Sequence, residues 1–173
     1  MSFPLGTRVA ACLVTLAACS PSLDWRQTRA EGSDVVLLFP CRPDRDERTV
    51  RVDGADLRMQ MVSCHAAGAA FALAFAEAPD ATRVTPLVAA LRAAAAANIG
   101  AVPTVSVFAV AGATPNEQSA LLRMEGRLPD GRRVVEHAAF FVKGLRVYAA
   151  TVLGESIPAE AVETFFASIK SAS

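Results

Sequence analysis

The segment from Met59 to His65 holds the side chains best suited to chemistry in this chain. If it forms a strand, Met59 and Met61 project from one face, and the thiol of Cys64 and the imidazole of His65 follow directly. Thioether, thiol and imidazole groups are soft ligands that suit Cu(I). The same alternation points Cys64 away from the two methionines, so the four side chains do not converge on one ion. We therefore predict no metal site and keep copper binding as an alternative.

The rest of the sequence lacks the patterns of common catalytic sites. No serine or cysteine nucleophile is placed at a strand-to-helix elbow, and the sequence contains no CxxC, phosphate-binding loop or HExxH motif. His137 lies in an apolar stretch, which indicates a buried structural histidine. Glu125 and Glu136 could serve as paired glycosidase carboxylates only within a cleft. We therefore predict a protein that is not an enzyme and needs no cofactor.

The charge of the chain excludes one large class of partners. Its 17 basic and 17 acidic residues balance, and the only lysines are Lys143 and Lys170. Binding to nucleic acid needs a concentrated positive face, and no polybasic patch is present. We therefore expect no nucleic-acid partner.

The N-terminus has the pattern of an export signal. Arg8 supplies a positive charge, Val9 to Ala18 is an apolar run too short to span a membrane, and Leu16-Ala17-Ala18-Cys19 ends it. This LAAC motif resembles the lipobox of bacterial lipoproteins. The resemblance implies that residues 1–18 are a signal peptide, that Cys19 receives a lipid, and that the lipid holds the protein on a membrane. Because Ser20 rather than aspartate follows, it implies the outer membrane of a Gram-negative cell, with the domain facing the periplasm.

Two cysteines are left once the N-terminal segment is assigned. Cys12 leaves with the signal peptide and Cys19 carries the lipid, so Cys41 and Cys64 remain. An even pair in an exported chain favours a disulfide. Closing a loop of this length would stabilise the fold by roughly 3 kcal/mol.

Residues 19–33 are expected to form a lipidated tether, and residues 34–173 a single domain. The tether contains Trp25 and Arg26. An aromatic residue and a cation close to the lipid suit an interfacial foothold on the membrane. Trp25 could instead pack against the domain and fix its orientation, and the sequence leaves both alternatives open.

Hydrophobic periodicity places the expected elements of the domain. A helix is predicted over 82–98, where Val84, Leu87, Val88 and Leu91 follow helical spacing and Asp80 or Thr82 can cap the start. A second helix is predicted over 158–171, with Ala161, Phe165 and Ile169 on one stripe. Strands are predicted over 35–39, 49–52, 57–63, 70–76, 104–110, 120–128, 133–142 and 145–153. The fold class is α+β, an antiparallel sheet of about six to seven strands flanked by one long internal helix and a C-terminal helix.

Two turn dipeptides set the expected hairpin registers. A two-residue turn at Asp130-Gly131 would place Glu125 opposite Glu136 and Met124 opposite His137. Arg123 and Arg127 would then lie diagonal to Glu136 and offset the like-charge pair. A turn at Lys143-Gly144 would likewise place Phe140 opposite Val147 and Ala139 opposite Tyr148.

The order of several short motifs resembles the PsbP-like fold over Val35 to Lys170. These motifs are Phe39-Pro40-Cys41-Arg42-Pro43 after the first strand, Ala113-Thr114-Pro115-Asn116-Glu117 before the strand triplet, Tyr148 in the last strand, and Phe165, Phe166, Ser168 and Ile169 in the terminal helix. The resemblance implies a non-catalytic accessory or binding module in envelope assembly or maintenance, with a protein partner. The alternative is a lipoprotein that binds a small ligand or copper, with a pocket between the sheet and the 82–98 helix.

A structural feature separates these two functions. A deep cleft with converging polar groups would favour a small ligand, whereas a shallow apolar patch on a sheet edge would favour a protein partner.

Overall fold

A computed structural model describes residues 23–52 and 54–171 of the chain. The predicted signal peptide, residues 1–18, and Cys19 lie outside these residues. The described strands are β1 (Arg26–Arg29), β2 (Val35–Phe39), β3 (Asp44–Val52), β4 (Ala55–Ala66), β5 (Ala69–Glu77), β6 (Thr104–Ser106), β7 (Ala120–Arg127), β8 (Arg133–Lys143), β9 (Arg146–Gly154) and β10 (Lys170–Ser171). The helices are α1 (Ala81–Asn98) and α2 (Ala159–Ala167).

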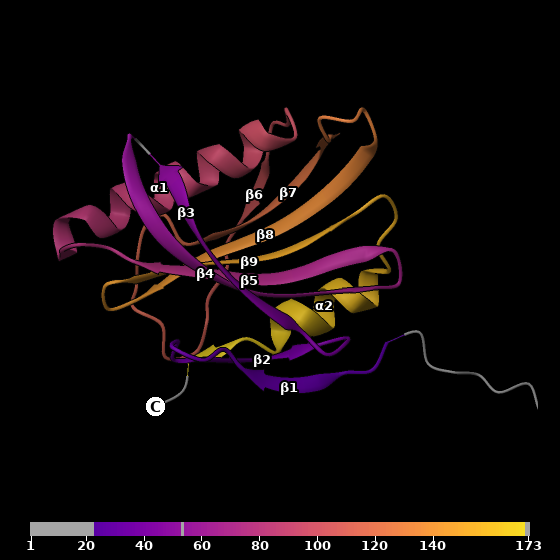
Figure 1. The fold of residues 1–173 in the computed structure, drawn as a ribbon, viewed down its shortest axis with the longest axis horizontal. Helices are drawn as coiled ribbons and strands as arrows, with labels where there is room; N and C mark the ends of the chain where they lie inside the picture. The colour runs from indigo at the N-terminus through magenta and orange to yellow at the C-terminus, as the bar shows by residue number, and fades with distance from the viewer. Residues whose placement is uncertain (1–22, 53, 172–173) are drawn as a thin grey trace, which may run out of the picture.

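Seven of these strands form one antiparallel sheet in the order β3-β4-β5-β9-β8-β7-β6. Strands β1, β2 and β10 form a small second sheet. Helix α1 covers one face of the large sheet, and α2 with the small sheet covers the other (Figure 1). The predicted α+β class, its antiparallel sheet and its two helices are therefore confirmed.

The two faces of the large sheet are packed differently. On the α2 side, Phe165 contacts Phe39 and Phe71 edge to face, with ring centroids 5.5 and 5.4 Å apart. On the α1 side, small alanines of β5 and β8 face Val84 and Val88 of the helix. Aromatic pairs add stabilisation beyond their buried area, so the face under α2 is the aromatic core of the molecule.

Helix α1 is fixed at both ends by the residues that border it. Asp80 caps its N-terminus, where the carboxylate accepts hydrogen bonds from the backbone N–H groups of Thr82 at 2.8 Å and Arg83 at 3.2 Å. At the other end, the Arg127 N–H donates to the Ile99 carbonyl at 2.9 Å. A Cβ atom on Gly126 would lie 2.1 Å from that carbonyl oxygen, so only glycine allows this approach.

Both predicted hairpin registers are wrong. At Asp130-Gly131 the loop has three residues, Pro129 to Gly131, with hydrogen bonds from the Gly131 N–H to the Leu128 carbonyl and from the Leu128 N–H to the Arg132 carbonyl. Proline suits the first turn position and Gly131 has φ +87°, which produces a three-residue loop in place of the expected two. Met124 therefore pairs with Glu136, and Arg123 with His137.

At the second hairpin the two turn residues are Gly144 and Leu145, because glycine with φ +58° takes the first turn position. Phe140 consequently pairs with Ala149, and Phe141 with Tyr148. The observed partner of each residue lies two positions beyond the predicted partner, so each side chain stays on its predicted face of the sheet.

Several strands and one helix also differ from their predicted extents. Strand β3 begins at Asp44 instead of Thr49, β6 ends at Ser106, and α2 ends at Ala167, where Ser168 donates to the Phe165 carbonyl. Strand β1 lies inside the segment expected to be a tether. The packed part of the fold thus begins before residue 34.

Residues 24–26, which were expected to belong to the tether, pack on the domain. Trp25 meets Phe71 edge to face, with ring centroids 6.3 Å apart. The Asp24 N–H donates to the Pro40 carbonyl at 2.8 Å, and Arg26 is paired with the Asp24 carboxylate. Of the two alternatives for Trp25, packing against the domain is the one found.

Candidate functional site

The β6 edge of the large sheet exposes a group of apolar side chains. We use the term β6 edge for residues 102–107, in which Val102 is 92% exposed, Val105 53% and Val107 95%. Strand β6 is last in the sheet and pairs on one side with β7, with Val105 opposite Leu122. Of the large apolar side chains in the described part of the chain, only Leu145 is also exposed. Most of the exposed large apolar side chains of the described residues therefore lie on or beside an edge strand, whose outer backbone N–H and C=O groups face no neighbouring strand of the sheet.

The β6 edge also lacks charge. No charged residue occurs between Arg92 and Glu117, so both the strand and its flanking loops are neutral. Sequence reasoning predicted a strand over 104–110 but did not mark these valines. Their alternation with Thr104 and Ser106 is equally typical of an interior strand, and only the sheet order shows that β6 is at an edge.

A cleft of about 610 Å³ lies between the sheet and the first half of α1. Its walls are the free end of the β3–β4 hairpin and the helix residues Arg83, Pro86 and Leu87, and the end of β5 forms its floor. The cleft lies where the sequence placed the pocket of the ligand alternative. Its volume falls in the range of small-molecule sites.

Two of the arginines that line the cleft are ion-paired with acidic residues of the same lining. Arg58 and Glu47 are 2.6 Å apart, and Arg146 lies 3.7 Å from Glu77. Arg146 also lies 3.1 Å from Asp34 outside the lining. The hydrogen bond and the charge of Glu47 raise the pKa of Arg58, which stays a cation at any physiological pH.

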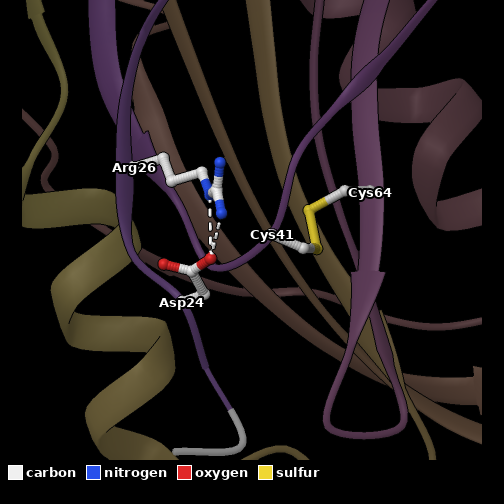
Figure 2. The surroundings of a disulfide bond; sticks show 4 residues. All are labelled: Asp24, Arg26, Cys41 and Cys64. Atoms are coloured by element: carbon white, nitrogen blue, oxygen red, sulfur yellow. Dashed lines mark hydrogen bonds and ion pairs between the residues drawn. A yellow bond between two sulfur atoms is a disulfide. The ribbon is translucent and has the colours of Figure 1, made fainter.

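The predicted disulfide between Cys41 and Cys64 is present. The sulfur atoms are 2.02 Å apart and the Cα atoms 6.0 Å apart. Figure 2 shows the bridge joining the loop after β2 to β4, beside Asp24 and Arg26. Both cysteines of the domain are therefore joined, and neither is a free thiol.

The structure does not bring the copper candidates together. Cys64 is part of the disulfide and buried on the α2 side, whereas the Met61 sulfur lies 3.8 Å from an Arg48 nitrogen that donates to it. Met59 is half-buried and His65 is exposed. Within residues 23–52 and 54–171, no three His, Cys, Asp or Glu residues are grouped to hold a metal ion.

The corrected register separates the two candidate carboxylates. Glu125 pairs with Val135 and is exposed, in an ion pair with Arg123 at 2.6 Å. Glu136 projects from the opposite face, opposite Met124 and Leu153. The expected pairing of Glu125 with Glu136 is wrong, and the two carboxylates share no cleft.

Glu136 is a buried acid that the sequence did not single out as buried. Its side chain is 7% exposed, and burial raises its pKa to about 7. His137, on the opposite face, is half-buried, and burial together with the nearby Arg123 lowers its pKa. The alternation of Val134, Glu136, Ala138 and Phe140 could have revealed this position, because three of these four residues are apolar.

Comparison of the chain with models of known protein families found no match, and comparison with curated proteins found none either. Among the described residues, neither helix combines the length and apolar character needed to cross a membrane.

Proposed function

We propose that this protein is a non-enzymatic lipoprotein of the bacterial envelope, held by a lipid on Cys19 in the outer membrane and facing the periplasm. The LAAC motif at residues 16–19 supports the anchor. The resemblance of residues 35–170 to the PsbP-like fold supports an accessory or binding role, and the α+β architecture is compatible with it.

The β6 edge supports a role in protein binding and is the observation on which this proposal depends. Natural proteins cover or charge an open edge strand because its free N–H and C=O groups can pair with another chain. Here the edge is neutral, and Val102, Val105 and Val107 are exposed beside it. An extended apolar segment of a partner protein can add to β6 through backbone hydrogen bonds while its side chains cover the valines.

Site-specific photocrosslinking in the native cell tests this function. A photoreactive amino acid at position 107 should capture a discrete partner, and the same group at Thr49 of β3 should not. Equal capture at both positions, or none at position 107, would contradict binding at the β6 edge.

A mass spectrum of the protein isolated from its native membrane tests the anchor separately. We expect loss of residues 1–18 and a lipid-sized mass gain on Cys19. An unprocessed N-terminus would overturn the localisation but not the partner site.

A further inference from the structure

The cleft between the sheet and α1 exists because the β3–β4 hairpin extends beyond the end of the neighbouring strand, β5. Strand β4 pairs with β5 over Gln60–Ala66, and residues 55–59 extend beyond that ladder. Figure 1 shows the hairpin extending beside α1. Helix α1 begins directly after β5, with Pro79 between them, so hairpin and helix enclose a space above the end of β5.

Apolar side chains form the larger share of the lining of this space, alongside the charged groups described above. Ala76 of β5 is buried on the α1 side of the sheet, and Leu57 and Leu87 line the cleft from the hairpin and the helix. Pro79 and Pro86 add rigid apolar surface. Binding of an apolar ligand group against these side chains would be favourable because it removes apolar surface from water.

The charges around the cleft favour a neutral ligand. Its lining contains three arginines and three acidic residues, so it has no net formal charge. Arg58 and Arg146 already have carboxylate partners in the lining, Glu47 and Glu77. A charged ligand would lose its hydration and compete with these pairs for a counter-charge, whereas an uncharged ligand avoids that cost.

We propose that this cleft binds an uncharged, largely apolar small molecule. The site is separate from the β6 edge, because none of residues 102–107 lines it. Its occupation therefore does not depend on the proposed protein partner.

Photolabelling with a matched pair of probes tests the proposal on the full chain in lipid nanodiscs. Benzophenone is neutral, and 4-benzoylbenzoate has the same photoreactive group with one negative charge. We expect benzophenone to label the tryptic peptide from Val84 to Arg92 on the order of tenfold more than the peptide from Val134 to Lys143, and 4-benzoylbenzoate to label it several-fold less. Equal labelling of both peptides, or stronger labelling by the anion, would overturn the proposal.

Variants on one helix supply the control. Leu87→Glu places a charge in the cleft and should reduce labelling of the 84–92 peptide on the order of tenfold. Ala94→Glu adds the same charge at an exposed position of α1 outside the cleft and should leave the labelling unchanged. If Leu87→Glu fails to fold, Ala55→Trp at the exposed mouth of the cleft replaces it and should block labelling by filling the space. Unchanged labelling in a folded cleft variant would overturn the site.

Discussion

The two edge strands of the seven-stranded sheet differ in length, charge and apolar exposure. Strand β3 forms one edge with nine residues, six of which are charged, and its ion pairs include Arg48–Asp46 at 3.4 Å and Arg58–Glu47 at 2.6 Å. The β6 edge at the other end has three residues in the strand, no charge, and exposed valines on and beside it. Charge on an edge strand opposes pairing with another chain, so β3 is protected and β6 is not.

This difference supports the proposed binding of a partner at the β6 edge. An exposed apolar edge strand favours aggregation, so natural proteins usually cover or charge such edges. On the β3 side, the chain is also tied covalently, because Cys41 precedes β3 and is joined to Cys64 of β4. The β3 edge is therefore charged and reinforced by a disulfide, whereas the β6 edge is uncharged and carries exposed apolar side chains.

Removing the disulfide tests the reinforcement of the β3 side and should have the largest effect. The bridge joins residues 23 positions apart, and the chain-entropy model gives about 3 kcal/mol for a loop of this length. The double variant Cys41→Ser/Cys64→Ser should lose about that much free energy of unfolding in urea. The wild-type protein in reductant should match the variant, and an unchanged midpoint would show that the β3 side does not depend on the bridge.

Glu136 lies on β8, in the half of the sheet that includes β6, and should make the stability of the protein depend on pH. Its pKa is raised from 4.5 to about 7 by burial, so the folded protein binds this proton more tightly than the unfolded chain. The sign follows from linkage: stability is higher below pH 4.5, declines as pH rises from 4.5 to 7, and stays reduced above. Glu136→Gln should therefore be more stable than wild type by about 2 to 3 kcal/mol at pH 8, and about equal to it at pH 4.

Urea titrations at pH 4, 6 and 8 measure this slope. Glu125→Gln on the neighbouring strand is the matched control, since that carboxylate is exposed and ion-paired with Arg123. A pH slope that persists in Glu136→Gln would assign the titration to another group.

A charge at β6 would make the two edges alike. Val105→Lys places a cation on an uncharged strand at a side chain already 53% exposed, so stability should change little. Crosslinked partner captured through a photoreactive group at position 107 should fall on the order of tenfold, because the edge then resembles β3. Thr49→Lys, which adds a charge to the edge that already has many, should leave capture unchanged.

The reverse change on β3 should have the smallest effect. Replacing the three central charges of this strand with Asp46→Asn, Glu47→Gln and Arg48→Gln should alter the unfolding midpoint hardly at all, because exposed ion pairs contribute little. The variant should show a slight rise in self-association at high protein concentration by sedimentation velocity, as the edge loses its protection. No rise at all would mean that twist or length, and not charge, protects β3.

The helices and the buried strands were accessible from the sequence because their patterns are strong. The 82–98 helix matches α1 within one residue at its start, with Asp80 as its cap, and the stripe of Ala161, Phe165 and Ile169 is buried as predicted. The disulfide followed from counting cysteines after assigning the N-terminus. The helices depend on local hydrophobic periodicity, and the disulfide depends on how many cysteines are left to pair.

The remaining features depend on pairings that the local sequence does not encode. Residues 44–48 have no apolar alternation because that part of β3 is exposed on both faces, so its length was missed. Pro129 converted an expected two-residue turn into a three-residue loop, which moved Glu136 away from Glu125. The β6 edge and the cleft arise from strand order and from an unequal strand length, and both emerge only once the sheet is assembled.

Residues 24 and 25 contact the domain directly, which would limit the distance between the domain and the proposed lipid on Cys19. The Asp24 N–H donates to the Pro40 carbonyl and Trp25 lies on Phe71, so only four residue steps separate residue 23 from the proposed lipid on Cys19. Four Cα steps of 3.8 Å span at most about 15 Å. With the proposed lipid in place, a domain on so short a link would stay beside the bilayer and would meet the proposed partner by lateral diffusion, which replaces a three-dimensional search by a two-dimensional one.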